Sequence, residues 1–488
     1  MNVVLKKLKK YYNYDSLYNF QENVIKNVLN GKDIFVLAKT SGGKSICYQL
    51  PALIVRGITI IICPLRSLIE DQVNNLKKRN IKFLTFYGDM DLEDKQNVLN
   101  LLNKSHGKMK IHMLYTTPEC IEKNQDFLDT LIYLSKEKLL TRFVIDEAHT
   151  VSLWGNNFRN SYLWLKELKN IFSNIPITAL TATSTYITQK DILNILQIND
   201  AVIIRDKLIR NNLYLDIRPS FINKNNDIIN FIKDKYYKKT GIIFCITQET
   251  CEKLTNLLKK NSINCEYYHA SLSKTKRNII QNEWINNNIN VIVATIAFGM
   301  GIDKSDVRFI IHYNIPNSIE NYYQEIGRAG RDGNKSTCLL FYDEKDLNLH
   351  VSMIKSNIDK ISSCYINYQL QKLNDFKEYI NNIHDCRHKQ LCYNFGDYIN
   401  DCNNLCDNCE NYNFNEKILL NFKNESLNLK NIISKYNKKL NLELLFNKYN
   451  NSFKKIPQLV FVGTNTTIRL CLYLFYLGRF YSIILIFD

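Results

Sequence analysis

The chain of 488 residues is long enough for roughly three or four domains, and its 45% of hydrophobic residues excludes a disordered chain. Its 64 Lys and Arg residues outnumber the 47 Asp and Glu residues, which leaves a formal net charge of +17. A surplus of this size favours polyanionic partners such as nucleic acid or an anionic membrane surface. Lys and Asn are abundant along the whole chain, so a biased genome is the alternative explanation.

The amino-terminal segment, Met1 to Lys10, has no apolar run long enough for a secretion signal, so we expect a reducing interior compartment and free thiols. Five of the 14 cysteines nevertheless fall within one short window: Cys386, Cys392, Cys402, Cys406 and Cys409. Because disulfides are disfavoured in such a compartment, this clustering indicates a metal site.

Short β-branched runs recur in front of loops that contain Gly, Pro or Ser, and polar segments long enough for helices separate them. This alternation is typical of repeated βαβ units and predicts an α/β fold with parallel sheets. Two α/β domains are expected, 1–206 and 207–345, with their boundary in Asp206–Pro219, where the pattern lapses. The predicted strands are Ile34–Leu37, Thr59–Ile62, Phe143–Ile145 and Ile177–Leu180, then Gly241–Phe244, Val291–Val293 and Phe309–Ile311.

Beyond about Tyr342 the predicted strands stop and a helical platform is expected to lead into the cysteine cluster, which gives a third domain of residues 346–412. Apolar residues follow helical spacing on one face there, at Leu370, Leu373, Phe376, Ile380 and Ile383.

Residues 413–488 show no clear chemistry, and we expect a degenerate or truncated winged-helix region there, with one helix across Asn465–Gly478. The apolar stretch Leu470–Phe487 is interrupted by Gly478 and Arg479. Its length is borderline for crossing a bilayer, so a buried helix and strand are expected, with a membrane segment as the minor alternative.

A phosphate-binding loop follows the first predicted strand, in the order Ala38-Lys39-Thr40-Ser41-Gly42-Gly43-Lys44-Ser45. In such a turn, backbone N–H groups and a helix N-terminus point at phosphate oxygens. Lys44 is expected to reach the β- and γ-phosphates of ATP, and the Ser45 hydroxyl to hold Mg²⁺. A plain Gly-Gly turn is the alternative, which the Lys-Ser pair disfavours. The expected nucleotide contacts of the loop are Thr40, Ser41, Gly42, Gly43, Lys44 and Ser45.

Two acids, Asp146 and Glu147, end the predicted strand Phe143–Ile145. Ligands of parallel sheets bind at the carboxyl ends of the strands. Asp146 suits Mg²⁺ coordination, and Glu147 suits polarising the water that attacks the γ-phosphate. A helix N-cap pair is the alternative, but the phosphate-binding loop favours catalysis.

With these two motifs in place, residues Tyr14 to Cys409 resemble superfamily 2 helicases, and the RecQ family in particular. The resemblance implies two RecA-like motor domains that hydrolyse ATP and move along DNA from 3′ to 5′. It rests on ordered segments similar to motifs Ia, Ib, III, V and VI of that superfamily: Cys63–Val73, Thr117–Glu119, Thr181–Thr183, Val293–Lys304 and Tyr323–Gly333.

In the last of these segments, Arg328 and Arg331 are the candidate cations for the transition state. An arginine that closes from one lobe onto a phosphate held by the other links lobe movement to chemistry. We expect Arg331 to be the arginine finger and Arg328 to support it, while Gln324 contacts the nucleotide site.

The segment Ser152–Arg159 resembles the aromatic-rich loop of the RecQ family. Trp154 and Phe158 offer faces on which bases can stack, and Arg159 offers a cation for phosphate or for stacking. Core packing of the aromatics is the alternative, which for Phe158 is equally plausible.

The cysteine spacing also fits the RecQ resemblance, with Cys386, Cys402, Cys406 and Cys409 as ligands of a structural Zn²⁺. Four thiolates close a tetrahedral site and leave no open position for catalysis. The spare candidates Cys392, His384 and His388 rank lower. Buried free thiols are the alternative, but they explain four cysteines in a polar segment poorly.

Base recognition departs from the family pattern, because Tyr14 and Gln21 match it whereas Tyr18 stands where Arg is expected. Adenine is expected to stack between the two tyrosines while Gln21 hydrogen-bonds its edge. In the phosphate-binding loop, Ser41 stands where Gly is common in the family. In the aromatic-rich loop, Asn156 and Asn157 stand where the family has a His-Asp pair.

The leading hypothesis is therefore a DNA helicase that uses ATP, Mg²⁺ and Zn²⁺ on single-stranded and branched DNA in replication, recombination and repair. A DNA-structure binding or annealing module is the second hypothesis, because the terminal region is short, and an RNA helicase is the third. We expect the protein to be a monomer or weak oligomer that does not associate with a membrane. In a eukaryotic source we expect it in the nucleus. The Asn- and Lys-rich loops resemble proteins from AT-rich genomes of protozoan parasites.

Overall fold

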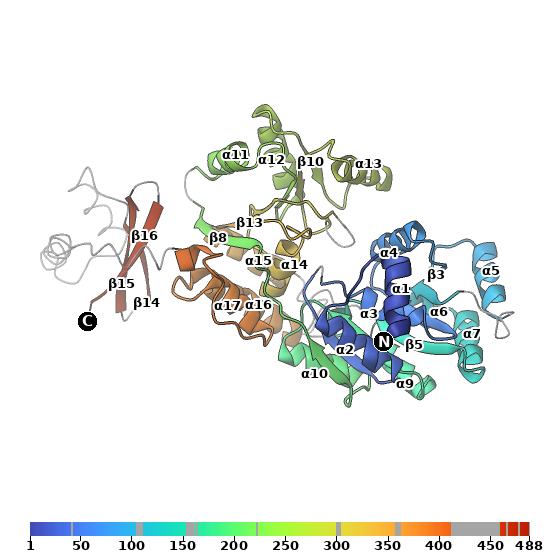
Figure 1. The fold of residues 1–488 in the computed structure, drawn as a ribbon. Coiled ribbons are helices and arrows are strands. Elements are labelled where there is room, and N and C mark those ends of the chain that lie inside the picture. Colours follow the sequence, from blue (N-terminus) through green and yellow to red (C-terminus); the bar gives the residue numbers. More distant parts are fainter. Residues whose placement is uncertain are drawn as a thin grey trace, which may run out of the picture. The chain divides into compact units, whose positions relative to one another are not determined.

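The structure is a computed structural model that describes residues 1–40, 42–103, 111–152, 162, 164–220, 223–298, 304–356, 363–410, 459–464, 467–476 and 479–487. The chain divides into two compact units, Met1–Tyr412 and Asn413–Asp488. The first unit contains two parallel sheets followed by a helical segment (Figure 1).

The first sheet has seven strands in the order β3-β4-β2-β5-β6-β1-β7, and every neighbouring pair is parallel. We call this sheet and its helices the first lobe. Its strands are β1 Ile34–Leu37, β2 Ile58–Ile62, β3 Leu84–Phe86, β4 Met113–Thr116, β5 Leu140–Ile145, β6 Ile177–Thr181 and β7 Val202–Arg205.

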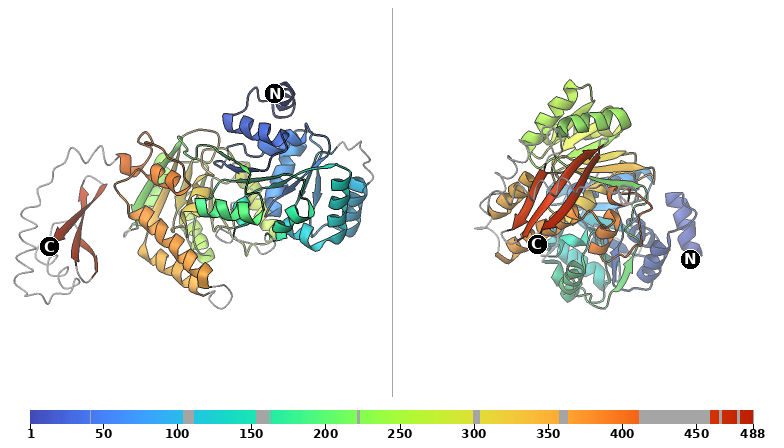
Figure 2. Two further views of the ribbon diagram at one scale, coloured as in Figure 1. Left: turned by 90° about the horizontal axis from the view of Figure 1, so that it is seen from below. Right: turned by 90° about the vertical axis from the view of Figure 1, so that its left-hand side faces the viewer.

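Helices cover both faces of this sheet (Figure 2). Alternate residues of β1 belong to two separate apolar clusters, with Phe35 and Leu37 in one and Ile34 and Val36 in the other. A parallel sheet buried on both faces requires such continuous apolar strands. The helices are α1 Asn2–Tyr12, α2 Asn19–Leu29, α3 Ile46–Ala52, α4 Arg66–Lys78, α5 Leu92–Asn103, α6 Pro118–Lys123, α7 Gln125–Lys136, α9 Glu167–Ile171 and α10 Tyr186–Ile195, with short 3₁₀ turns η1 Ala148–Thr150 and η2 Trp164–Lys166.

The second sheet is also parallel, with six strands in the order β10-β11-β9-β12-β13-β8. This sheet and its helices form the second lobe. Its strands are β8 Leu213–Pro219, β9 Gly241–Phe244, β10 Cys265–Tyr268, β11 Val291–Ala294, β12 Phe309–His312 and β13 Ser336–Tyr342, and its helices are α11 Lys224–Lys235, α12 Gln248–Lys260, α13 Lys274–Ile285 and α14 Ile319–Ile326.

All seven predicted strands are confirmed, as β1, β2, β5, β6, β9, β11 and β12. The segment Asp206–Pro219, where the pattern lapses, contains β8. Its side chains alternate between buried residues such as Leu213 and Leu215 and half-exposed ones such as Tyr214, as expected at the edge of a sheet.

The helical segment after the second sheet consists of α15 Glu344–Lys355, α16 Ser363–Asn381 and α17 Arg387–Asn394. We call α16, α17 and the chain up to Glu410 the zinc module. The predicted platform is α16, in which Leu373, Phe376 and Ile380 are buried. Ile383 lies beyond its end and is 42% exposed, so the predicted helical face was one turn too long.

The second unit contains three antiparallel strands in the order β14-β15-β16: Leu459–Thr464, Thr467–Tyr476 and Arg479–Phe487. The helix predicted across Asn465–Gly478 was wrong, because β15 occupies it. Periodicity cannot separate helix from strand in a continuous apolar run, and the β-branched and aromatic residues there favour a strand. The described residues of this unit do not show a winged helix.

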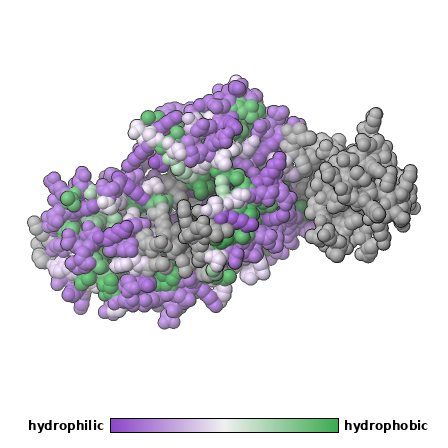
Figure 3. Space-filling view, turned by 180° about the vertical axis from the view of Figure 1, so that it is seen from behind, coloured by the Kyte–Doolittle hydropathy of each residue, from purple (hydrophilic) through white to green (hydrophobic). Residues whose placement is uncertain are grey.

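None of the described helices combines the length and the apolar character needed to cross a bilayer. The face drawn in Figure 3 is mainly hydrophilic, and hydrophobic residues gather on it in scattered patches. Most of the apolar material lies instead in the clusters that flank the two sheets.

Candidate nucleotide site and zinc module

The P-loop, residues Ala38–Ser45, runs from the end of β1 to the start of α3. Gly43 has a φ of +76°, and a Cβ there would lie 2.4 Å from the side-chain nitrogen of Gln21, so glycine is required. Nζ of Lys44 donates to the carbonyl oxygens of Ala38 at 3.1 Å and Lys39 at 3.3 Å. The side chain of Lys44 therefore folds back over its own loop. The predicted nucleotide contact Ser41 lies outside the described residues.

The predicted base-recognition residues surround the start of α2. Gln21 is buried, where its Nε2 donates to the carbonyl oxygen of Gly43 at 3.2 Å and its Oε1 accepts from the backbone N–H of Tyr18 at 2.9 Å. The rings of Tyr14 and Tyr18 are 51% and 68% exposed. The structure thus couples Gln21 to the P-loop and leaves two accessible tyrosine faces.

The acid pair lies at the carboxyl end of β5, beside the P-loop. Asp146 is buried and accepts hydrogen bonds from the backbone N–H of Glu147 at 3.1 Å and from the hydroxyl of Tyr48 at 3.4 Å. Glu147 has a φ of +51°, a left-handed conformation that is costly for a side chain of this kind. Its Oε2 is buried without a hydrogen-bond partner among the described residues, and Nδ1 of His149 stands 3.3 Å away.

The side-chain carboxyls of Asp146 and Glu147 differ in their pKa values. Burial and the adjacent charge of Glu147 raise the pKa of Asp146 to about 6. Burial also opposes ionisation of Glu147, but His149 and the charges of Lys44 and Arg328 lower its pKa to about 2. The lower pKa of Glu147 keeps this carboxylate ionised at neutral pH, as a base requires, and its buried Oε2 faces the imidazole of His149.

His149 connects the acid pair to the second lobe. Its Nδ1 stands 2.9 Å from the hydroxyl of Thr181, and its Nε2 stands 3.3 Å from the side-chain nitrogen of Gln324. The same nitrogen of Gln324 donates to the hydroxyl of Thr183 at 2.9 Å. The sequence patterns did not predict His149 or Thr183 as site residues, although His149 follows the acid pair closely and Thr183 belongs to the segment similar to motif III.

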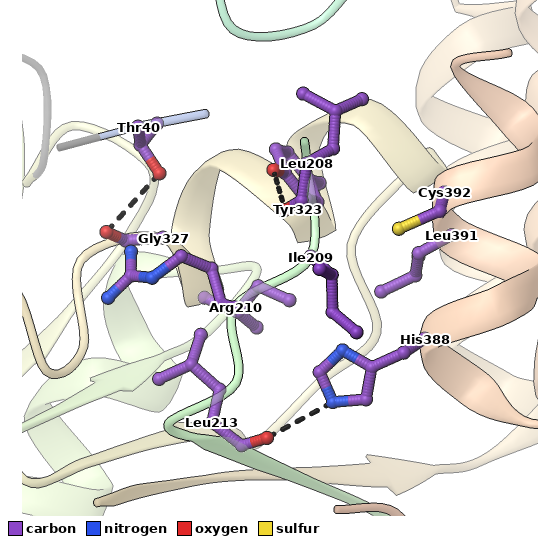
Figure 4. A pocket seen from close by; sticks show the side chains of 11 residues that line it. Thr40, Leu208, Ile209, Arg210, Leu213, Tyr323, Gly327, His388, Leu391 and Cys392 are labelled. Carbon is purple, nitrogen blue, oxygen red and sulfur yellow. Dashed lines mark hydrogen bonds between the residues drawn. The ribbon is translucent and has the colours of Figure 1, made fainter. Parts of the chain in front are cut away.

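The arginine loop, Gly327–Gly333, follows α14 and faces the P-loop. The hydroxyl of Thr40 donates to the carbonyl oxygen of Gly327 at 3.4 Å (Figure 4). Burial and the positive charge of Arg331 lower the pKa of Arg328 to about 10, and its Nε is buried without a hydrogen-bond partner among the described residues. The structure therefore brings an arginine from the second lobe within electrostatic reach of Glu147.

A chain of buried and half-buried hydrogen bonds reaches Ser45 from the amino-terminal helix. The hydroxyl of Tyr12 donates to Oε1 of Gln49 at 2.9 Å, and Nε2 of Gln49 donates to Oε1 of Gln72 at 3.0 Å. Nε2 of Gln72 then donates to the hydroxyl of Ser45 at 3.0 Å. No sequence pattern predicts this chain of hydrogen bonds, although Gln72 belongs to the segment similar to motif Ia.

The residues predicted to hold Mg²⁺ fit such an ion chemically. Ser45 hydrogen-bonds Tyr48, and Tyr48 donates to Asp146, so one tyrosine joins both candidate ligands. A hydroxyl and a carboxylate are oxygen donors of the kind that Mg²⁺ prefers.

Four cysteine sulfurs converge in the zinc module. The Sγ of Cys402 stands 3.7 Å from that of Cys406 and 3.6 Å from that of Cys409, and Cys406 stands 4.0 Å from Cys386. In a tetrahedron with metal–sulfur bonds of about 2.3 Å, the sulfurs are about 3.8 Å apart. The four predicted ligands therefore have the geometry of a structural Zn²⁺ site.

The spare candidates lie outside this cluster as the structure describes it. Nε2 of His388 contacts the carbonyl oxygens of Leu213 at 3.0 Å and Leu405 at 3.2 Å. Cys392 is buried and lines, together with His388, the pocket drawn in Figure 4.

The zinc module is fixed to the free edge of β8. The backbone N–H of Leu215 donates to the carbonyl oxygen of Leu405 at 3.0 Å, and that of Ile217 donates to Oδ2 of Asp407 at 3.2 Å. Asp407 in turn accepts two hydrogen bonds from the buried guanidinium of Arg387. The missed strand β8 is thus the element that positions the metal site. The predicted DNA contacts Trp154, Phe158 and Arg159 lie outside the described residues.

Comparison with known proteins matches three families in chain order. Residues 18–192 match the DEAD/DEAH box helicase family, residues 223–333 match the helicase conserved C-terminal domain, and residues 344–410 match the RecQ zinc-binding family. The last match covers the four-cysteine cluster.

Several relatives are 39% identical to this chain, among them the following two. A RecQ-like DNA helicase of Caenorhabditis elegans matches over 412 residues, which cover 83% of this chain and 41% of that protein. A putative ATP-dependent RNA helicase of Acanthamoeba polyphaga mimivirus matches over 404 residues, which cover 83% of this chain and 71% of that protein. The chain spans between 27% and 41% of the length of several curated relatives.

Among solved structures, the DNA-bound crystal structure of the DUF1998 helicase MrfA matches 74% of this chain and 54% of that chain, with a TM-score of 0.58. Its sequence identity of 19% supports the fold alone. The fold of the two lobes is therefore shared with that helicase.

Proposed function

Because the chain belongs to the RecQ family of superfamily 2 helicases, we propose that it is an ATP-dependent DNA helicase that unwinds duplex or branched DNA in the 3′ to 5′ direction. The observation that carries this proposal is the meeting of an acid pair and an arginine loop, from different lobes, at one P-loop. The family match gives no support to an annealing module without unwinding.

For hydrolysis, we propose that Lys44 exchanges its carbonyl partners for the β- and γ-phosphates of ATP. The carboxylate of Glu147 takes a proton from the attacking water while the water oxygen bonds to the γ-phosphorus and the bond from that phosphorus to ADP breaks. Ser45 and Asp146 would hold Mg²⁺, which supplies positive charge to the phosphate oxygens.

The second lobe supplies the cations, with Arg331 as the finger and Arg328 beside it. Positive charge aimed at the γ-phosphate stabilises the negative charge that accumulates there in the transition state. Gln324 stands against His149 and Thr183, so the contact between the lobes changes when the nucleotide site changes. Tyr14 and Tyr18 would stack on the base, with Gln21 linking them to the P-loop.

The remaining assignments are also proposals. Single-stranded DNA would contact Trp154, Phe158 and Arg159, and the basic surplus of the chain would favour its backbone. We propose domain bounds of 1–206, 207–345, 346–412 and 413–488, a monomer or weak oligomer, and a nuclear location in a eukaryotic source.

A strand-displacement assay tests the proposal. Duplexes with a 3′ tail, a 5′ tail or a fork are incubated with ATP, and the expected result is unwinding of the 3′-tailed and forked substrates. Lys44→Ala serves as the control without hydrolysis. Unwinding that requires the 5′ tail, or DNA-stimulated hydrolysis without any strand separation, would contradict the proposal.

An RNA helicase is the second candidate, because the mimiviral relative bears that name and the match covers 71% of its length. Matched DNA and RNA single strands distinguish the two in an ATPase assay. Stronger stimulation by DNA supports the DNA helicase, and stronger stimulation by RNA supports the second candidate.

A further inference from the structure

Arg210 lies between the two lobes, in the linker of residues 206–212 that joins β7 to β8. Only 9% of its surface is exposed. Its Nη2 donates to the carbonyl oxygens of Ala329 at 3.0 Å and Gly330 at 2.8 Å, in the middle of the arginine loop. The guanidinium thus grips the backbone directly between Arg328 and Arg331.

Asn212 holds the same turn from the same linker. Its side-chain nitrogen donates to the carbonyl oxygens of Gly330 at 2.8 Å and Asn334 at 2.9 Å. Gly330 has a φ of +54°, and a Cβ there would lie 2.5 Å from that nitrogen. Because two linker side chains converge on one carbonyl oxygen, the conformation of the arginine loop depends on where the linker lies.

The linker is also tied to the other parts of the nucleotide site. Asp206 stands 3.9 Å from Nζ of Lys39 in the P-loop. The carbonyl oxygen of Leu208 accepts from the hydroxyl of Tyr323 at 2.7 Å (Figure 4). The backbone N–H of Leu208 donates to Oδ2 of Asp397 in the zinc module at 2.8 Å. When one lobe moves relative to the other, the linker that contains Arg210 must therefore move as well or change these contacts.

We propose that Arg210 is a positioning residue that orients Arg328 and Arg331 toward the γ-phosphate, with Asn212 as its partner. The position of the linker then determines the orientation of the arginine loop. The inference rests on the proposed function. In this role Arg210 does not contact the nucleotide itself.

A purely structural arginine would also bind carbonyl oxygens, so the test needs a measurement that scaffolding alone would not change. Arg210→Gln keeps a donor but loses the fork and the charge. We expect its kcat for DNA-stimulated ATP hydrolysis to fall about 100-fold, as small misplacement of a catalytic group commonly costs, with the KM for ATP within about threefold. Arg210→Lys should recover part of that loss.

Nucleotide affinities give the second readout. Because the arginines act on the transition state, Arg210→Gln should weaken ADP–aluminium fluoride binding about as much as it lowers kcat, while binding of the non-hydrolysable analogue AMP-PNP stays unchanged. The matched control is Arg308→Gln, since Arg308 binds Asp332 at the exposed side of the same loop at 2.7 Å. Asn212→Ala, which is less buried, should show a smaller loss of the same kind and decides the matter if Arg210→Gln fails to fold.

The outcomes separate this inference from the proposed function. Normal kcat in Arg210→Gln and Asn212→Ala, with Arg331→Ala inactive, overturns the positioning role alone. An equal loss in Arg308→Gln, or an equal loss of AMP-PNP binding, also overturns it, because the effect would then be general disruption. Normal turnover in Arg331→Ala overturns the arginine assignment of the proposed function itself.

Discussion

Thr40 and Gly327 join the P-loop of the first lobe to the arginine loop of the second lobe. The threonine hydroxyl donates to the glycine carbonyl oxygen at 3.4 Å, and a Cβ at Gly327 would lie 2.0 Å from that hydroxyl oxygen (Figure 4). No conformational requirement accompanies this glycine, since its φ is not positive. The missing side chain is therefore needed for the approach of the lobes.

We predict that Gly327→Ala separates the P-loop from the arginine loop and lowers kcat for ATP hydrolysis by about 10- to 100-fold. A methyl group at 2.0 Å from Thr40 Oγ1 forces one of the two loops to move. Steady-state ATPase kinetics with single-stranded DNA measures the effect. Gly88→Ala, where a Cβ meets nothing within 4 Å, is the control and should behave like the wild type. Equal activity of both variants would show that the approach is not required.

Glu147→Gln should abolish turnover but retain ATP binding, because it removes the ionised base without changing the size of the side chain. The loss expected for general base catalysis is about 10² to 10⁴-fold in kcat. Binding of a fluorescent ATP analogue, measured beside single-turnover hydrolysis, separates the two effects. Lys44→Ala should instead lose both. Near-normal hydrolysis in Glu147→Gln would remove this residue from the catalytic role.

Gln72→Leu should break the hydrogen-bond chain at its last link before Ser45. The Ser45 hydroxyl would lose its donor, and Gln49 would keep only its Tyr115 partner at 2.9 Å for its side-chain nitrogen. We expect a loss of about 1 to 3 kcal/mol in the free energy of unfolding and a higher Mg²⁺ concentration for half-maximal ATPase activity. Urea denaturation and a Mg²⁺ titration measure these quantities.

Tyr12→Phe cuts the same chain at its distant end and is the control for Gln72→Leu. Its stability should fall, whereas its Mg²⁺ requirement should match that of the wild type, because Gln72 still donates to Ser45. An unchanged Mg²⁺ requirement in Gln72→Leu would disprove the link to the ion site.

Metal analysis should find about one zinc per chain, and chelation should destabilise the zinc module together with its contacts to β8. Cys402→Ser should lose the metal, since Cys402 stands within 3.7 Å of two other sulfurs. Cys392→Ala should retain it, because Cys392 lies in the same segment but outside the cluster. Full zinc content in Cys402→Ser would contradict the assignment.

The sequence predicted the central strands well because they are buried on both faces and read as continuous β-branched runs, as in Ile58–Ile62. It missed the four edge strands of the two parallel sheets, β3, β7, β8 and β10, whose half-exposed residues interrupt the pattern. The inner strands β4 and β13 were also missed, because they contain few β-branched residues.

The site was predictable where chemistry is local in sequence, as in the P-loop, the acid pair and the cysteines. Contacts between segments that are far apart could not be predicted in this way. Gln49 and Gln72 look like surface residues until the fold joins them in one network and buries Gln49. Arg210 gains its partners from residues more than a hundred positions away.

The edge strand β8 has a mechanical consequence. One of its sides belongs to the sheet of the second lobe through β13, and its other side is bonded to Leu405 and Asp407 beside the cysteine sulfurs. The zinc module is therefore joined to the second lobe through β8, while Nη1 of Arg205, at the end of β7 in the first lobe, donates to the carbonyl oxygen of its Phe395 at 3.0 Å. Because the module contacts both lobes, a change in their relative position must strain or break the contact at Arg205.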